Sequence, residues 1–287
     1  MTDAGATLTL PDGREAHWFD TGAVQAPVVV WHHGTPSDGR IYGVLREAAV
    51  ARGIRVISVA RPGYPGSTRR IGRTVADSAR DVLAVLDAAG VERFAAVGSS
   101  GGGPHALALA AVAGERATGV ATFASLAPYD DDPEWFEGMA DPSALEAAVR
   151  GLEARTRHDD EAEFDPAVFS AADWAALQGD WAEMGADAQA TGEAGNEGAV
   201  DDDRAFVTDW GVDVRQITAS VLIVHGDEDR MVPAGHATRL LCLLPDATSW
   251  WFADDGHVSG LRALGSALDW LLEHDLSSPS RGPVAGP

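Results

Sequence analysis

The 287-residue sequence holds a single cysteine, Cys242. One thiol cannot form a disulfide within the chain, and so little cysteine is typical of a protein kept in a reducing compartment. Cys242 falls in the apolar run Leu240–Leu244, which predicts a helix face packed against a core. We therefore interpret the thiol as a packed side chain and not as a nucleophile.

Long hydrophobic runs and basic residues are also scarce. No apolar run approaches the length of a membrane span, and residues 1–6 lack the basic and apolar regions of a signal peptide. The chain has 21 Lys and Arg residues against 44 Asp and Glu, for a net charge of −23. Such a charge repels nucleic acid and anionic membrane surfaces. We expect a cytoplasmic protein that binds neither; no oligomeric state is predicted.

Strand-like and helix-like segments alternate along most of the chain. Hydrophobic residues make up 45% of it, enough for the core of one large α/β domain or of a domain with an insertion. Apolar runs rich in β-branched residues predict strands at 7–10, 15–20, 28–32, 55–60, 94–97, 119–126, 220–224 and 248–252. Helical periodicity with caps and glycine stops predicts helices at 42–51, 74–89, 105–113, 234–244 and 261–273. A Pro-Asp-Gly turn makes the first two strands a hairpin, and the remaining order predicts a mostly parallel, eight-stranded sheet with helices on both faces.

The stretch between residues 129 and 216 has a different character. It is acidic, rich in alanine and tryptophan, and helical in its periodicity. Asp-Pro pairs at 141–142 and 165–166 predict helix starts, residues 192–203 predict a loop, and the tryptophans at 135, 174, 181 and 210 are typical of core. We interpret residues 129–216 as a helical insertion packed over an α/β domain formed by residues 1–128 and 217–275. The Ser/Pro/Gly-rich tail at 276–287 is predicted to be disordered.

Two runs of three aspartates, at 130–132 and 201–203, could suggest a metal site. Neither run has the spaced oxygen ligands and central glycine of a calcium loop. We therefore predict that both runs are solvated surface.

A glycine-rich corner, Gly98-Ser99-Ser100-Gly101-Gly102, joins a predicted strand to a predicted helix. The pattern Gly-x-Ser-x-Gly is typical of a nucleophile elbow, where a strained turn exposes the serine hydroxyl beside the free N–H groups of a helix N-terminus. The spacing does not fit a dinucleotide-binding loop, and the Lys-Ser/Thr pair of a phosphate-binding loop is missing. The corner predicts Ser100 as a nucleophile; a structural tight turn and an anion site are the alternatives.

A serine hydroxyl is a weak nucleophile at neutral pH and needs a base that a carboxylate orients. Asp229 and His257 each follow a later predicted strand, so both should meet Ser100 at the carboxyl edge of the sheet, where open α/β sheets bind ligands. The chain order Ser, Asp, His is the order found in α/β-hydrolases. We predict His257 as the base and Asp229 as its acid, with Asp227 and Asp130 as alternative acids.

The oxyanion of a tetrahedral intermediate needs backbone donors. The N–H of Gly101 follows the nucleophile directly, and the loop His33-Gly34-Thr35-Pro36 follows an earlier buried strand. Pro36 has no N–H, so Thr35 is the expected second donor. We predict an oxyanion hole made of Thr35 and Gly101, with His33 as a structural ring that braces the loop.

These motifs resemble the α/β-hydrolase fold superfamily over nearly the whole chain. The resemblance rests on His33-Gly34-Thr35-Pro36, Arg61-Pro62-Gly63-Tyr64-Pro65-Gly66-Ser67, Gly98-Ser99-Ser100-Gly101-Gly102, Gly226-Asp227-Glu228-Asp229 and Gly256-His257. It implies the triad Ser100, Asp229 and His257, and it implies that the insertion is the cap over the pocket. Members often carry Asp where Ala60 stands, a difference that concerns loop bracing. Haloalkane dehalogenases and epoxide hydrolases of this superfamily use Asp at the elbow, so Ser100 argues against both, and Gly101 replaces the Trp usual in proline iminopeptidases.

The expected activity is hydrolysis of an ester, thioester or lactone of a small organic substrate through an acyl-enzyme, with no metal or organic cofactor. Carbon–carbon bond hydrolysis, peptidase activity of the proline iminopeptidase kind and cofactor-free oxygenation are alternatives on the same fold. A ligand receptor without turnover is the alternative from another class. Apolar residues of the insertion should form the pocket walls and set the substrate.

Overall fold

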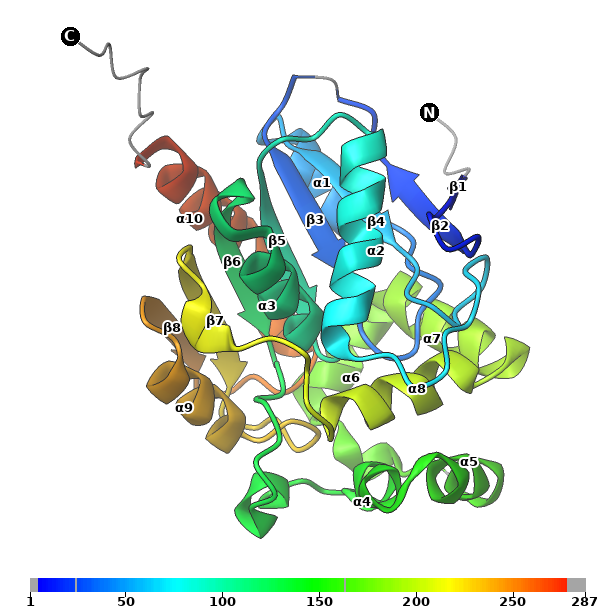
Figure 1. The fold of residues 1–287 in the computed structure, drawn as a ribbon. Helices are drawn as coiled ribbons and strands as arrows, with labels where there is room; N and C mark the ends of the chain where they lie inside the picture. Colours follow the sequence, from blue (N-terminus) through cyan, green and yellow to red (C-terminus); the bar gives the residue numbers. More distant parts are fainter. Residues whose placement is uncertain (1–4, 24, 163, 278–287) are drawn as a thin grey trace, which may run out of the picture.

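The computed structural model describes residues 5–23, 25–162 and 164–277. Over these residues the chain forms an eight-stranded sheet in the order β1-β2-β4-β3-β5-β6-β7-β8, which confirms the predicted fold class (Figure 1). The strands are β1 (Ala6–Thr9), β2 (Glu15–Asp20), β3 (Val28–His32), β4 (Arg55–Val59), β5 (Phe94–Ser99), β6 (Ala117–Phe123), β7 (Ser220–Gly226) and β8 (Ala247–Phe252). β2 pairs antiparallel with β1 and β4, and every other neighbouring pair is parallel.

Helices cover both faces of the sheet (Figure 1). The helices α1 (Gly43–Val50) and α10 (Leu264–Ser277) lie on one face, and α2 (Val75–Ala88), α3 (Gly102–Ala113) and α9 (Ala234–Leu243) lie on the other. Successive side chains of a strand point to opposite faces. Val30 therefore joins the core beneath α2 and α3, while Val29 and Trp31 join the core beneath α1 and α10. Burial on both faces explains the uninterrupted apolar run of β3.

The predicted start of α2 is confirmed at the level of its cap. The Thr74 hydroxyl accepts a hydrogen bond from the Asp77 N–H, and the Asp77 carboxylate accepts one from the Thr74 N–H. This reciprocal capping box satisfies two N–H groups that a helix start would otherwise leave unpaired.

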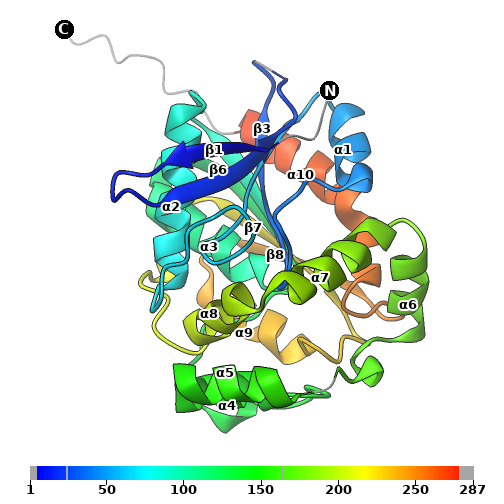
Figure 2. The same cartoon turned by 90° about the vertical axis from the view of Figure 1, so that its right-hand side faces the viewer.

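A helical insertion occupies residues 129–216, between β6 and β7. Its elements are η2 (Pro133–Phe136), α4 (Ser143–Arg150), α5 (Leu152–Glu161), η3 (Pro166–Val168), α6 (Ala171–Gln178), α7 (Ala182–Ala194), α8 (Glu197–Phe206) and η4 (Val214–Gln216), where η marks a 3-10 turn. The helices α6, α7 and α8 lie beyond the carboxyl ends of the parallel strands, and α4 and α5 pack on the far side of α8 (Figures 1 and 2). The insertion thus faces the edge of the sheet where the predicted site residues gather.

Three predictions for the insertion differ from the structure. The predicted loop at 192–203 is wrong, because α7 and α8 occupy most of it and only a short break at Gly195 separates them. The Asp-Pro pair at 165–166 begins a 3-10 turn and no α-helix. Trp174 is only half-buried, whereas Trp135, Trp181 and Trp210 are core residues as predicted.

The prediction that the aspartate run 201–203 is solvated surface is also wrong. Asp201 is 3% exposed and Asp202 is completely buried. Arginines of the α/β domain reach these carboxylates: Arg69 pairs with Asp201, and Arg61 pairs with Asp202. A buried carboxylate is tolerated where such a partner neutralises it.

The expected burial of Cys242 is wrong as well. The thiol lies on the exposed side of α9, because Ala237 and Leu240 form the side of the helix that packs on the sheet. At the C-terminus α10 continues to Ser277, and the rest of the predicted disordered tail lies outside the described residues. Among the described helices, none combines the length and the apolar character needed to cross a membrane.

Candidate active site

Ser100 sits at the corner between β5 and α3. Its φ of +54° is unusual for a residue with a side chain, and its N–H donates to the Phe123 carbonyl at 2.8 Å. The neighbouring glycines are required because a side chain has no room at their positions. A Cβ on Gly98 would lie 2.3 Å from the Gly102 carbonyl oxygen, and one on Gly102 would lie 2.0 Å from the His32 carbonyl oxygen. The glycine pattern therefore allows the tight turn that presents the serine hydroxyl.

The structure brings the three predicted triad side chains together. The Ser100 Oγ lies 2.8 Å from His257 Nε2, and His257 Nδ1 lies 2.9 Å and 3.1 Å from the two carboxylate oxygens of Asp229. Ser100 follows β5, Asp229 follows β7 and His257 follows β8, so parallel strands deliver all three to one edge of the sheet. The hydrogen bonds place the Nδ1 proton toward Asp229 and leave Nε2 able to accept the serine proton.

The choice among the alternative acids follows from the same geometry. Asp229 is 5% exposed, and its Oδ1 also accepts hydrogen bonds from the N–H groups of Met231 and Val232. Asp227 is exposed, and Asp130 forms an ion pair with Arg239 at 2.7 Å. Only Asp229 of the three carboxylates hydrogen-bonds His257 in the part of the chain that the structure describes.

The electrostatics of His257 suit a base held by a carboxylate. Burial lowers the pKa of His257, but the Asp229 charge, the hydrogen bond to it and the more distant Asp173 charge outweigh burial and raise the pKa above its usual value. A raised pKa means that the ring takes up a proton more readily, which is the property that a general base needs.

The two predicted oxyanion donors are neighbours. A Cβ on Gly101 would lie 2.3 Å from the Thr35 hydroxyl oxygen. Within the described residues, neither the Thr35 N–H nor the Gly101 N–H donates to a protein acceptor. His33 donates from Nδ1 to the Gly34 carbonyl and accepts at Nε2 from the Arg61 N–H, so its ring braces this loop. Two unused backbone donors therefore lie beside Ser100.

Four residues near the site were not predicted from the sequence, and all four belong to the insertion. The Phe169 ring lies with its centroid 6.3 Å from that of His257. Asp173 accepts hydrogen bonds from the residues that follow His257, Asp202 accepts one from the Thr35 hydroxyl, and Phe206 lies within 3.1 Å of the Cβ position on Gly101. No motif marks these residues, since each reaches the site only through the packing of the insertion on the sheet edge.

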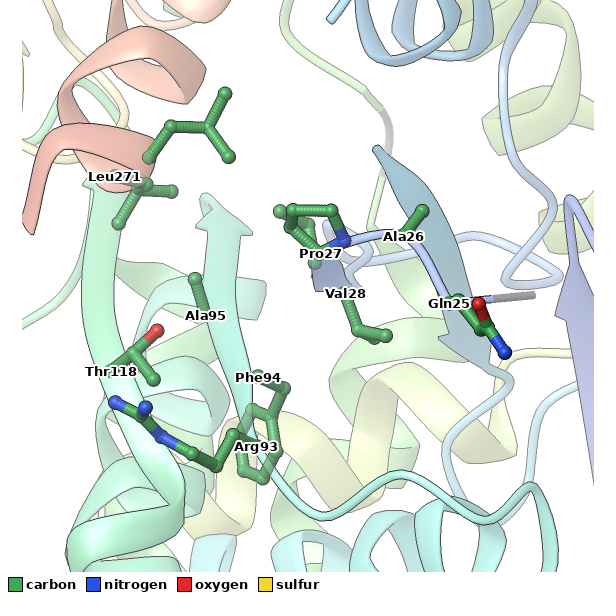
Figure 3. A pocket seen from close by; sticks show the side chains of 11 residues that line it. Gln25, Ala26, Pro27, Val28, Arg93, Phe94, Ala95, Thr118 and Leu271 are labelled. Atoms are coloured by element: carbon green, nitrogen blue, oxygen red, sulfur yellow. The ribbon is translucent and has the colours of Figure 1, made fainter. Parts of the chain in front are cut away.

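A cavity of about 310 Å³ lies at the end of the sheet where the parallel strands begin, opposite the end that carries Ser100 (Figure 3). It is lined by the first residues of β3 and β5, by Thr118 of β6 and by Leu271 and Leu272 of α10. The amino ends of the strands form it, so it shares no residue with the Ser100 site. Among the described residues no group of three or more His, Cys, Asp and Glu side chains could hold a metal ion.

Comparison with known proteins gives one family and several relatives. A family model described as the alpha/beta hydrolase fold matches residues 27–262. The chain is 28% identical to a non-heme chloroperoxidase of Burkholderia pyrrocinia over 84% of this chain and 88% of that protein. It is 28% identical to a 2-hydroxy-6-oxo-6-phenylhexa-2,4-dienoate hydrolase of Burkholderia cepacia over 84% of each chain. A thermophilic esterase of Thermogutta terrifontis has the same fold, with a TM-score of 0.71, 20% identity and coverage of 95% of this chain and 99% of that one.

Proposed function

The chain belongs to the alpha/beta hydrolase fold family, and we propose that within this family it is a serine hydrolase that cleaves an ester, thioester or lactone of a small organic molecule. The observation that carries the proposal is the pair of contacts of His257. Its Nε2 lies 2.8 Å from the Ser100 hydroxyl, and its Nδ1 lies 2.9 Å from Asp229. This is the arrangement of a nucleophile, a base and an orienting acid.

In the proposed reaction the Ser100 Oγ attacks the carbonyl carbon while His257 Nε2 takes the hydroxyl proton. The carbonyl oxygen becomes negative and receives hydrogen bonds from the N–H groups of Thr35 and Gly101. When the intermediate collapses, the leaving oxygen or sulfur takes the proton from His257 and an acyl-serine remains. A water molecule then gives a proton to His257 and attacks the acyl carbon. The bond to the Ser100 Oγ breaks, the Oγ takes the proton back from His257, and the carboxylic acid is released. Asp229 stays ionised throughout and stabilises the charged imidazole.

We also propose that residues 129–216 form a cap over the substrate. The support is that Phe169 lies beside His257 and Phe206 beside Gly101, so apolar side chains of the insertion face the reacting groups. These aromatic rings favour a small organic substrate with an apolar part. The free thiol of Cys242 is compatible with a reducing compartment, and the cytoplasm is our proposed location.

Hydrolysis of a carbon–carbon bond is the second candidate. It is favoured by the 28% identity to the 2-hydroxy-6-oxo-6-phenylhexa-2,4-dienoate hydrolase, since that relationship covers 84% of both chains. A substrate panel of short p-nitrophenyl esters, thioesters, lactones and a 2-hydroxy-6-oxo-dienoate separates the two candidates. The proposal expects the ester, thioester or lactone class to be turned over with the highest kcat/KM.

The test of the nucleophile uses a fluorophosphonate probe and two neighbouring serines. We expect mass spectrometry to find the probe on Ser100 in the wild-type protein, and Ser100→Ala to lose both labelling and turnover. Ser99→Ala is the matched control, because Ser99 is buried at the end of β5 and makes no contact with His257 in the described structure. A wild-type protein that binds ligand but is neither labelled nor active would instead be a receptor.

A further inference from the structure

A buried cluster of charges joins the insertion to the loop that carries Thr35. Asp202 of α8 is completely buried, and its carboxylate pairs with Arg61 and Arg73 and accepts a hydrogen bond from the Tyr64 hydroxyl at 2.7 Å. Burial would raise the pKa of Asp202, but the two guanidinium groups outweigh burial and hold the pKa well below its usual value. The carboxylate is therefore charged, and it is the part of this cluster that the insertion contributes.

The cluster holds the Thr35 loop by its side chain and by its backbone. The Thr35 hydroxyl donates to Asp202 Oδ2 at 2.8 Å. Arg61, which Asp202 fixes through Nε and Nη2, donates to the carbonyl oxygens of His33 and Gly34. The two carbonyl groups that precede the Thr35 N–H thus accept hydrogen bonds from Arg61, and Arg61 is itself paired with Asp202.

Gly101, the other proposed donor residue, also contacts this cluster. His105 Nδ1 donates to the Gly101 carbonyl at 2.9 Å, and His105 Nε2 lies 3.7 Å from Asp202. The Thr35 hydroxyl lies between Asp202 and Gly101, because a Cβ on Gly101 would come within 2.3 Å of it. Both residues of the proposed oxyanion hole are therefore hydrogen-bonded to this cluster, Thr35 to Asp202 and Gly101 to His105.

We infer that Asp202 is a positioning residue for the oxyanion hole: by accepting the Thr35 hydroxyl and fixing Arg61, it aims the Thr35 N–H at the substrate oxygen. This inference rests on the proposed serine hydrolase function. Donors that are already aimed where charge develops lower the barrier more than donors that must reorient. A displaced N–H would leave substrate binding nearly intact and would weaken an interaction made chiefly in the transition state.

The first pair of variants compares adjacent carboxylates of α8. Asp202→Asn removes the charge that fixes Arg61 and weakens the acceptor for Thr35. Asp201→Asn is the matched control, because Asp201 is also buried and paired with an arginine, Arg69, but has no contact with residues 33–35. We expect Asp202→Asn to lower kcat about tenfold or more with KM within about twofold of wild type, and Asp201→Asn to leave both nearly unchanged.

A second pair of variants tests the positioning role of Asp202 even if the Asp202→Asn variant does not fold. Thr35→Val keeps the backbone N–H and all charges of the cluster and removes the hydroxyl that donates to Asp202 and accepts from Arg61 Nη2 at 3.0 Å. Thr35→Ser restores that hydroxyl. We expect Thr35→Val to lose about tenfold or more in kcat and, in the same proportion, in affinity for a trifluoromethyl ketone, whose adduct with Ser100 carries the tetrahedral oxygen. Thr35→Ser should recover most of both.

The outcomes separate this inference from the proposed function. An active wild type whose Thr35→Val variant matches it in kcat and in ketone affinity overturns the role of Asp202 alone. The role is also overturned if Thr35→Ser has a kcat as low as that of Thr35→Val, because the hydroxyl that serine shares with the wild-type threonine would then make no difference. A wild type that neither turns over any ester, thioester or lactone nor reacts with fluorophosphonate overturns the serine hydrolase proposal, and the role of Asp202 with it.

Discussion

The carboxylate of Asp173 accepts a 2.9 Å hydrogen bond from the N–H of Ser259, two residues after His257. The same Oδ1 accepts from the Val258 N–H at 2.7 Å, and a Cβ on Gly256 would lie only 2.1 Å from Oδ2. Asp173 belongs to α6 of the insertion, whereas the loop that carries His257 belongs to the α/β domain. The insertion therefore holds the loop that carries His257 as well as facing its ring.

We expect Asp173→Ala to destabilise the fold and slow the reaction. The carboxylate is completely buried, and its removal leaves the Val258 and Ser259 N–H groups without an acceptor. Buried donors left unpaired cost about 1–3 kcal/mol, so the free energy of unfolding in urea should fall by about 2 kcal/mol or more. Asp180→Ala, at an exposed position, is the control and should stay within about 0.5 kcal/mol of wild type. A wild-type unfolding curve for Asp173→Ala would contradict this prediction.

The sequence predicted the α/β domain well because its signals are local. The apolar run of β3 reads as a strand buried on both faces, and the Thr74 capping box marks the start of α2. Gly98 and Gly102 are needed for a turn a few residues long, so the elbow can also be recognised locally. The positions of Asp229 and His257 follow from the rule that parallel strands end at one edge.

The insertion was predicted less well because its contacts are distant in sequence. Asp202 is buried by Arg61 and Arg73, which lie more than a hundred residues earlier, and composition alone makes an aspartate run look solvated. The predicted burial of Cys242 is wrong for a related reason. An apolar run predicts a helix, but which side packs on the sheet depends on how α9 is seated, and the structure turns the thiol outward.

Phe169 should contribute to substrate binding through its ring. Its centroid lies 6.3 Å from that of His257, so an apolar group bound near the base would pack against it. We expect Phe169→Ala to lower kcat/KM about tenfold for esters with a large apolar group and less for acetate esters. Phe164→Ala is the control, because Phe164 is 65% exposed and makes its ring contact with Phe169 rather than His257. Equal losses for large and small substrates would show that Phe169 does not select the apolar group.

Two glycines should respond in opposite ways to the same substitution. Gly98→Ala places a Cβ 2.3 Å from the Gly102 carbonyl oxygen, where the backbone cannot give way without distorting the elbow. We expect a loss of about 1–3 kcal/mol in unfolding free energy and a loss of turnover. Gly235→Ala lies in α9 with nothing within 4 Å of the new Cβ, so it should gain up to about 1 kcal/mol. Thermal or urea unfolding of the two variants measures both changes, and a stable, active Gly98→Ala would contradict the tight packing of the corner.

The activity should depend on pH through His257. Burial lowers the pKa of His257, but Asp229 and Asp173 outweigh it and raise the pKa above the usual value of about 6.5. The base works only when neutral, so kcat/KM should fall about tenfold per pH unit as the pH drops below the raised pKa. Asp229→Asn removes the main source of the increase and leaves burial, so the pKa falls and the acid limb moves to lower pH, although the rate itself is much reduced. Glu228→Gln, exposed on the same loop, is the control and should keep the wild-type profile. An acid limb at the same pH in the Asp229→Asn variant would show that another group controls the profile.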